Sequence, residues 1–179
     1  SLMIVIILFK FILTRCFITH SILINYIMDI SFTKAHGTGN DFIIFHKNDL
    51  NGQHLNCSII QKLCNRFLGI GSDGLLLLSE HNKLDFVMDY YNCDGTWETF
   101  CANGARCAAL FMFNRGSIKK RASMMGGDCP HDIHIYENEV SISMKSPSYK
   151  TDEIVVESFS GRHVDSGARH FVIHVHNIN

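Results

Sequence analysis

Residues Asn92–Gly116, NCDGTWETFCANGARCAALFMFNRG, begin as a polar, turn-rich segment and end as an apolar one. Between Ala105 and Phe113 only Arg106 is charged, and alanine and leucine favour helix. Gly116 follows, as is typical just after the last turn of a helix. Because a helix that is apolar on every side is a buried one, this stretch predicts a central helix packed on most of its faces, with the rest of the chain arranged around it.

The N-terminal end of this helix carries Cys101, Ala102, Asn103 and Gly104. The first N–H groups of a helix have no intrahelical partner, and the helix dipole gives that end a positive partial charge. Such an end favours the thiolate, which is the reactive form of cysteine, and it binds anions such as a carboxylate. We therefore predict that Cys101 is the most reactive thiol; a purely structural role for a single cysteine is the competing interpretation.

Two further segments are rich in glycine: His36–Phe42, which reads HGTGNDF, and Gly69–Gly74, which reads GIGSDG. The first has no third glycine and no helix after it, so it is not a dinucleotide-binding fingerprint. Strand patterns on both sides of it predict a hairpin instead, and its glycines permit a tight bend.

The remaining pattern is one of short strands around one or two helices. An amphipathic helix is predicted over Ser58–Leu68, where apolar residues recur at helical spacing. Met124–Pro130 is predicted as a loop, and His163–His170 as the connection between the last two strands. We expect an α+β domain in which a curled, mostly antiparallel sheet surrounds the central buried helix. Strands are predicted over Phe42–Phe45, Leu75–Leu78, Asp85–Tyr91, Ile133–Tyr136, Val140–Met144, Ile154–Val156 and Phe171–Ile178.

The composition is that of a globular chain, with 46% hydrophobic and 18% charged residues in a length of 179. The net charge of −1 gives no basic surface for nucleic acid, so no nucleic-acid partner is expected. Seven cysteines are an odd number, and they lack the regular spacing of a secreted disulfide scaffold. We therefore expect reduced thiols in a cytoplasmic protein.

Residues 1–27 differ in pattern from the rest of the chain. The uncharged run Ser1–Phe9 is shorter than the roughly 20 residues that span a membrane, so no membrane partner is expected. A well-patterned strand comes directly after Met28. We expect native translation to start there, which makes 1–27 a non-native or unassigned hydrophobic leader. A degenerate membrane anchor and an additional helix or targeting segment are the alternatives.

Three blocks of the chain resemble the diaminopimelate epimerase family: HGTGNDF from His36, GIGSDG from Gly69, and NCDG followed by CANGARC from Asn92. Their order and spacing fit the family from Met28 to about Ile178. The resemblance implies a diaminopimelate-epimerase-like fold and a cofactor-independent isomerase. It further implies interconversion of LL- and meso-diaminopimelate, on the route to lysine and cell-wall peptide. In this family two cysteines, one from each of two similar domains, face the α-carbon from opposite sides.

Carried onto this chain, the resemblance implies that Cys101 is the acid/base of the first domain. Backbone N–H groups at the helix start would hold the α-carboxylate of diaminopimelate. The segment Gly167–His170 resembles a site-lining segment of the second domain. The residues that the resemblance places against substrate are Asn40, Asn92, Ala102, Asn103, Gly104 and His170.

The chain departs from the family pattern in several places. Ala102 stands where glycine is usual, and Gly74 stands where some members carry a glutamine. The Ala168–Arg169 pair replaces Asn-Pro. The sequence ends at Asn179, before the second cysteine. With Ser146-Pro147-Ser148 as a boundary, we expect a first domain over 28–147, an incomplete second domain over 148–179, and a truncated form whose residues alone do not complete the acid/base pair.

Two other interpretations remain open. One is an isomerase of the same fold, such as a proline-racemase-like enzyme. The other is a non-catalytic relic, or a thiol-based metal- or redox-binding half-domain. A zinc site from Cys93, Cys101, Cys107 and a histidine has no Cys-x-x-Cys pair behind it, so we predict no metal. The family resemblance implies that no cofactor is needed. The expected partner is a small-molecule substrate, diaminopimelate, and a homodimer is left open.

Overall fold

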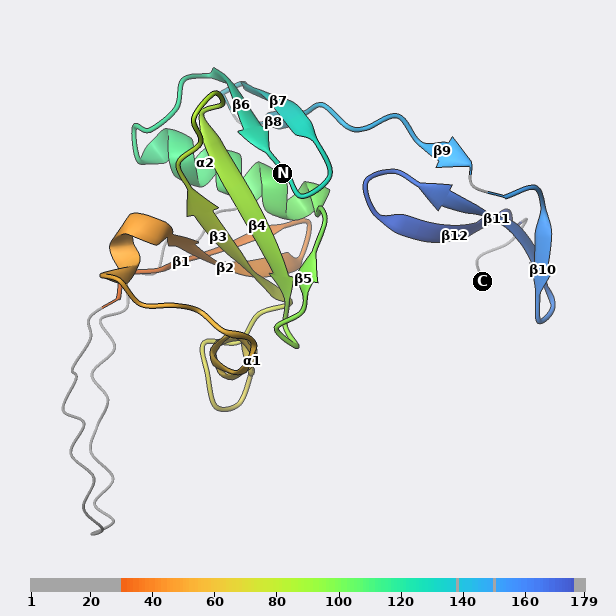
Figure 1. Ribbon diagram of the computed structural model, residues 1–179, viewed down its shortest axis with the longest axis horizontal. Coiled ribbons are helices and arrows are strands. Elements are labelled where there is room, and N and C mark those ends of the chain that lie inside the picture. Colours follow the sequence, from red (N-terminus) through yellow and green to blue (C-terminus); the bar gives the residue numbers. More distant parts are fainter. Residues whose placement is uncertain (1–29, 138, 150, 176–179) are drawn as a thin grey trace, which may run out of the picture.

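An eight-stranded sheet curls around helix α2 in the computed structural model (Figure 1). The structure describes residues 30–137, 139–149 and 151–175, so the predicted leader 1–27 lies outside the described residues. The sheet runs β1-β2-β3-β4-β6-β7-β8, and β5 pairs with β4. The β2–β3 and β4–β6 pairs are parallel and the others are antiparallel. The elements are β1 (Thr33–Gly37), β2 (Asn40–His46), η1 (Lys47–Leu50), α1 (Cys57–Cys64), β3 (Gly74–Ser79), β4 (Phe86–Asn92), β5 (Trp97–Glu98), α2 (Ala102–Asn114), β6 (Arg121–Met125), β7 (Pro130–Ile135) and β8 (Val140–Ile142).

Helix α2 is the predicted central helix. It packs against β1, β2, β3, β4, β7 and β8, on the concave side of the sheet. Its buried residues lie on several faces, as the all-round apolar pattern predicts. A Cβ on Gly104 would lie 3.0 Å from Leu76 Cδ2, so the first turn of α2 approaches β3 closely. Gly116 has a φ of 76°, which confirms it as the residue that ends the helix.

Strand β2 is covered on both faces. Phe42 and Ile44 belong to the core with α2, while Ile43 and Phe45 belong to a second core that includes Ile60 of α1. All of these side chains are buried. Side chains that alternate along a strand thus pack against a different helix on each face. The residues that follow Asn40 and Asp41 in β2 are therefore fixed between two cores.

Helix α1 is shorter than predicted. It ends at Cys64 rather than Leu68. The Asn65 side chain accepts the backbone N–H groups of Phe67 and Leu68, at 2.9 and 2.8 Å, and so offers them an alternative to helical hydrogen bonds. Phe67 and Leu68 are 96% and 90% exposed. The apolar periodicity predicted a helix as far as Leu68. After Cys64, however, the apolar residues Phe67 and Leu68 are exposed and form no buried face.

Two predictions in the second half of the chain were wrong. The predicted loop Met124–Pro130 is a hairpin, because Met125 pairs with Pro130 and only 126–129 form the turn. The predicted connection His163–His170 begins within a strand, β11 (Phe159–Asp165). Polar residues and a glycine give β11 a weak strand pattern of its own. Its pairing with β9, β10 and β12 supplies the hydrogen bonds that make it a strand.

A second sheet lies to one side of the first (Figure 1). It contains β9 (Ser148–Tyr149), β10 (Ile154–Val156), β11 and β12 (Arg169–Ile173), in the order β10-β11-β12 with β9 paired to β11. The turn after β11 reaches back to the first sheet, where Thr99 Oγ1 donates to the Gly167 carbonyl at 2.7 Å. This contact brings the second sheet close to the start of α2.

Within the described ranges, no helix is both long enough and apolar enough to cross a membrane.

The packing of α2 predicts the effect of Leu76→Ala. Leu76 is fully buried against α2, so the cavity should lower the free energy of unfolding by about 2–5 kcal/mol. Leu68→Ala is the matched control, because Leu68 is almost fully exposed and its loss should change stability by no more than about 0.5 kcal/mol. Urea unfolding followed by circular dichroism measures both. Equal losses in the two variants would contradict the described packing.

Candidate active site

Cys101 is the N-cap residue of α2. Its φ and ψ of −136° and 111° are extended, and its carbonyl accepts the first helical hydrogen bond, from the Ala105 N–H at 2.8 Å. Its side chain makes no capping hydrogen bond, so the thiol remains available for other partners. The N–H groups of the first helical turn point outward beside it, with the positive partial charge of the helix dipole. The helix start combines a half-buried thiol with a ready anion-binding surface.

Asn40 contacts this thiol, and Asn103 in turn contacts Asn40. Cys101 Sγ lies 3.7 Å from Asn40 Oδ1, and Asn103 Nδ2 donates to the same oxygen at 3.4 Å. Asn40 is brought there by the β1–β2 turn, in which Thr38 and Gly39 have φ values of 54° and 91°. A Cβ on Gly37 would lie 3.2 Å from the Asn103 carbonyl, so β1 runs directly against the start of α2. The predicted residues Asn40, Cys101 and Asn103 therefore form one group.

The orientation of the Asn40 amide is set by Asp73. Asn40 Nδ2 donates to Asp73 Oδ2 at 2.9 Å, which leaves Asn40 Oδ1 facing Cys101 and Asn103. Asp73 is itself fixed, because its N–H donates to Asp41 Oδ1 at 2.9 Å and its Oδ2 accepts the Asp41 N–H at 3.1 Å. This reciprocal link joins the two glycine-rich segments, HGTGNDF and GIGSDG.

Two cations stabilise that link. Lys34 Nζ and Arg66 Nη2 each lie 2.7 Å from an Asp41 carboxylate oxygen, and Arg66 also reaches Asp73 at 2.8 Å. Partial burial by itself would raise the pKa of Asp41, but the hydrogen bonds from Arg66 and Lys34 outweigh it and hold the pKa well below its usual range. Asp41 is thus a carboxylate at neutral pH, and the Asp41–Asp73 link is maintained by charge as well as by backbone hydrogen bonds.

Sequence reasoning missed these supporting residues. Arg106 is the one charged residue in the apolar stretch, and it donates to Asn103 Oδ1, which turns Asn103 Nδ2 toward Asn40. The single arginine in an otherwise apolar helix was the sequence feature that could have indicated a role for Arg106 in positioning a polar neighbour. No local signal paired Asp41 with Asp73, because they lie 32 positions apart.

Asn92 lies at the end of β4, opposite Gly74 of β3. Its Oδ1 accepts the Tyr90 hydroxyl at 2.7 Å, and its Nδ2 donates to Thr96 at 3.3 Å. Burial, with the nearby Cys101 as a further cause, raises the pKa of Tyr90 to about 12. The phenol therefore remains a neutral donor that orients Asn92. Among the described residues, the side-chain hydrogen bonds of Asn92 go to Tyr90, Thr96 and Glu98 and not to the Cys101 group.

The other predicted contacts divide into two sets. Ala102 and Gly104 lie in the first turn of α2 with Asn103. His170 lies on β12, opposite Val164 of β11, and its side chain is exposed. Among the described residues, the structure shows no contact between that side chain and the Cys101 group. The Gly167–His170 segment reaches the first sheet through Gly167, and the role of His170 in binding stays a prediction.

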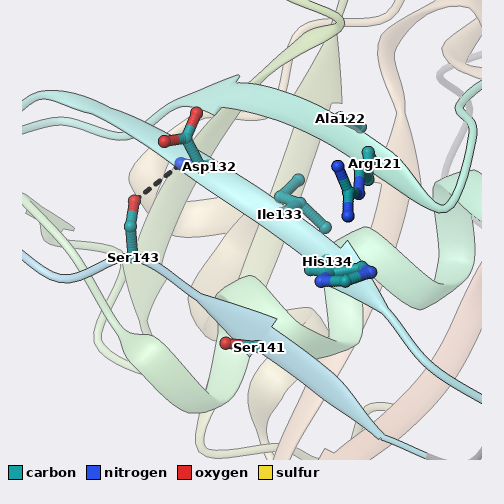
Figure 2. A pocket seen from close by; sticks show the side chains of 7 residues that line it. All are labelled: Arg121, Ala122, Asp132, Ile133, His134, Ser141 and Ser143. Carbon is teal, nitrogen blue, oxygen red and sulfur yellow. Dashed lines mark hydrogen bonds between the residues drawn. The ribbon is translucent and has the colours of Figure 1, made fainter.

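Two surface hollows differ in their relation to this group. One, of about 330 Å³, lies on the β1–β2 hairpin and is lined in part by Lys34, Asp41 and Arg66, which support the orientation of Asn40 through Asp73. The other, of about 360 Å³, lies on the face of β6, β7 and β8 that points away from α2 (Figure 2). Its lining has no thiol, and the Asp132 N–H donates there to Ser143 Oγ at 2.7 Å. Because the start of α2 carries a thiol and the hollow on β6, β7 and β8 does not, the start of α2 is the better candidate for an active site.

The environments of the thiols predict an order of alkylation. Cys101 should react first with limiting iodoacetamide because its thiol lies at the helix start. The Cys57 thiol donates to a backbone carbonyl at 3.3 Å, which requires its proton, and burial raises the pKa of Cys107 to about 12. Peptide mass spectrometry of timed samples gives the order. Faster labelling of Cys57, Cys93 or Cys129 would show that the start of α2 does not activate Cys101.

The sequence of this chain is similar to those of one known protein family. Residues 32–150 match the sequence profile described as diaminopimelate epimerase. The diaminopimelate epimerase of Flavobacterium psychrophilum is 42% identical over 114 residues, which cover 63% of this chain and 44% of that relative. That of Buchnera aphidicola subsp. Baizongia pistaciae is 36% identical over 143 residues, 78% of this chain and 50% of the relative. The chain spans about half the length of the curated relatives it matches.

Solved structures share the fold at low sequence identity. A hydroxyproline epimerase from Agrobacterium vitis, with bound trans-4-hydroxy-L-proline, superposes with a TM-score of 0.61 at 10% identity, over 79% of this chain and 50% of that chain. A PhzF-family phenazine biosynthesis protein from Bacillus anthracis has a TM-score of 0.54 at 14% identity, over 79% of this chain and 54% of that chain. These likenesses confirm the predicted α+β fold class. Because the family profile matches more than half of the sequence, the chain belongs to the diaminopimelate epimerase family.

Proposed function

We propose that this chain provides one thiol acid/base, Cys101, and the α-carboxylate site for epimerisation of diaminopimelate. The observation that carries the proposal is the group at the start of α2, where Cys101 Sγ lies 3.7 Å from Asn40 Oδ1 beside the unpaired N–H groups of the first turn. Family membership supplies the substrate. The geometry supports a thiol placed next to a carboxylate site.

Substrate binding begins with the α-carboxylate. The N–H groups of Ala102, Asn103 and Gly104 form the first turn of α2 and can donate to its oxygens. Asn40 Oδ1, oriented by Asp73, is an acceptor suited to the α-ammonium group. Together these groups would fix the α-carbon near the Cys101 thiol, and a fixed position removes much of the entropic cost of the reaction.

Proton transfer then uses the thiolate of Cys101. The thiolate takes the α-proton and becomes a thiol, while the electron pair of the C–H bond delocalises into the carboxylate. Negative charge grows on the carboxylate oxygens, where the helix N–H groups are already aimed and stabilise it. Return of a proton from a thiol to the α-carbon completes the exchange. A thiol serves in both directions when its proton affinity suits neutral pH.

Inversion requires a second acid on the opposite face of the α-carbon. Cys107 is not suited to this role, because it is fully buried within α2 and burial raises its pKa to about 12. The family resemblance assigns the role to a second cysteine of a second domain. We infer that Cys101 acts on one face only. We further infer a reducing, cytoplasmic setting, because the seven cysteines are an odd number and lack the regular spacing of a secreted disulfide scaffold.

The proposal predicts that α-hydrogen exchange depends on Cys101. The chain, incubated with LL- or meso-diaminopimelate in D2O, should incorporate deuterium at an α-carbon. Cys101→Ser should lower the rate about 10²-fold or more, as expected for loss of an acid/base. Cys93→Ser is the matched control, because the Cys93 thiol is exposed and the substitution keeps the backbone N–H that donates to the Asp73 carbonyl. Mass spectrometry gives the incorporation.

Chiral chromatography of the same samples separates two forms of the mechanism. Deuterium with inversion shows an acid on each face, and deuterium with retention shows Cys101 acting alone. Equal exchange by the wild-type chain and Cys101→Ser, or no exchange by either, would contradict the proposed role of Cys101.

A further inference from the structure

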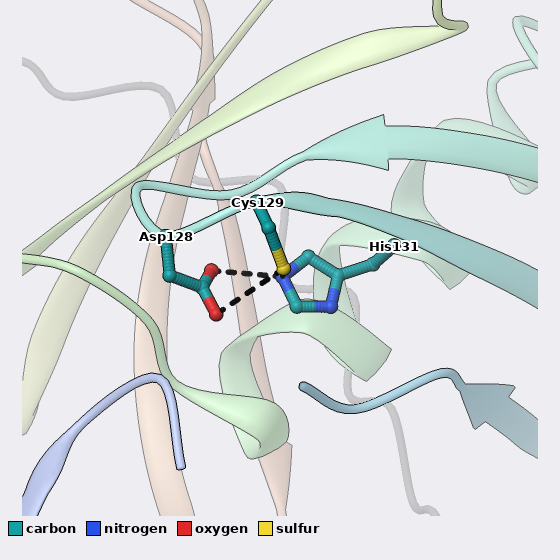
Figure 3. A group of neighbouring side chains, drawn as sticks. All are labelled: Asp128, Cys129 and His131. Atoms are coloured by element: carbon teal, nitrogen blue, oxygen red, sulfur yellow. Dashed lines mark hydrogen bonds and ion pairs between the residues drawn. The ribbon is translucent and has the colours of Figure 1, made fainter. Parts of the chain in front are cut away.

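A second group of reactive side chains lies at the β6–β7 turn, next to Thr99 and Phe100, which lead into α2 (Figure 3). It comprises Asp128, Cys129 and His131, whose ligand atoms all lie within 4.8 Å of one another. His131 Nε2 lies 2.8 Å from Asp128 Oδ1 and 3.8 Å from Cys129 Sγ, and Cys129 Sγ lies 3.6 Å from Asp128 Oδ2. The imidazole is 1% exposed and the carboxylate side chain 4%. The proposed reaction at Cys101 uses none of these residues.

The other ring nitrogen of His131 fixes its tautomer. Nδ1 lies 2.7 Å from the backbone carbonyl of Ser143, which can only accept a hydrogen bond, so Nδ1 carries a proton. Nε2 is then the ring nitrogen that faces Asp128 and Cys129, and it offers a lone pair once the proton that it shares with Asp128 Oδ1 is removed. Histidines that bind metals through one nitrogen commonly donate the other N–H to a backbone carbonyl in this way.

The distances from Cys129 Sγ to the other two residues are close to those of a tetrahedral metal site. Zinc lies about 2.3 Å from sulfur and about 2.0–2.1 Å from nitrogen or oxygen, which at tetrahedral angles separates sulfur from either by about 3.5 Å. The corresponding distances here are 3.8 Å to Nε2 and 3.6 Å to Oδ2. The shorter contact between Nε2 and Oδ1 is that of a shared proton. A metal ion would replace that proton.

Two glycines keep the ligand atoms clear of side chains. A Cβ on Gly126 would lie 2.9 Å from both Asp128 Oδ1 and His131 Nε2, and one on Gly167 would lie 2.5 Å from Asp128 Oδ2. Gly126 belongs to the β6–β7 turn, whereas Gly167 belongs to the second sheet. Two separate segments therefore place bare backbone against the cluster.

We propose that Asp128, Cys129 and His131 bind a divalent zinc-class ion through Oδ, Sγ and Nε2. The thiolate and imidazole favour such an ion over magnesium or calcium. His131 stacks on Phe100, with ring centroids 4.1 Å apart, and Thr99 both accepts the Gly127 N–H at 2.8 Å and donates to Gly167. Bound metal would brace the residues that lead into Cys101. Its role is structural, and it takes no part in proton transfer.

The test measures metal on the purified chain. The wild-type chain, saturated with zinc and then dialysed, should retain one zinc by elemental analysis, and cobalt in its place should give the intense visible bands of a tetrahedral thiolate site. Cys129→Ser should lose most of the retained zinc and the sulfur-to-cobalt band. Cys93→Ser, which removes an exposed thiol outside the cluster, should retain both.

Folding is checked separately, by circular dichroism of the metal-free proteins. Zinc should raise the thermal midpoint of the wild-type chain and of Cys93→Ser, and not that of Cys129→Ser. Equal zinc retention by Cys129→Ser and the wild type, or none by the wild type, would overturn the proposal. Because the readouts are metal content and stability, a failure here is distinct from a failure of the epimerase proposal.

Discussion

The burial of α2 determines the rest of the structure. A helix that is apolar on nearly every side must be surrounded, and the curled sheet covers it from β1 to β8. Its N-terminal end is only partly covered, with Cys101 as the N-cap and a positive partial charge. The same packing that stabilises the core therefore delivers a thiol and an anion-binding surface to one place. Stability and chemistry depend on the same thirteen-residue helix.

A charged link gives that place its orientation. Asp41 and Asp73 hold each other through backbone hydrogen bonds, and Lys34 and Arg66 offset their negative charge. Asn40 receives its orientation from Asp73. Two carboxylates this close would repel each other without the cations. Exposed ion pairs add little stability, so the network serves chiefly to position the Asn40 amide beside the thiol.

Much of this could be predicted from sequence where the signal is local. The burial of α2 and its end before Gly116 followed from composition and spacing, and the hairpin at Gly37–Gly39 from its glycines. Other features depend on contacts between distant residues. The link between Asp41 and Asp73 spans 32 positions, and β11 is a strand because neighbouring strands pair with it. The early end of α1 reflects competition by the Asn65 side chain, which apolar periodicity cannot reveal.

A crystal structure of the chain with diaminopimelate would test the central claim most directly. We expect the α-carboxylate at the N–H groups of Asn103 and Gly104, within hydrogen-bonding distance, and the α-carbon in van der Waals contact with Cys101 Sγ. Diaminopimelate bound instead in the hollow near His134, with the start of α2 vacant, would contradict the assignment of this helix start as the substrate site.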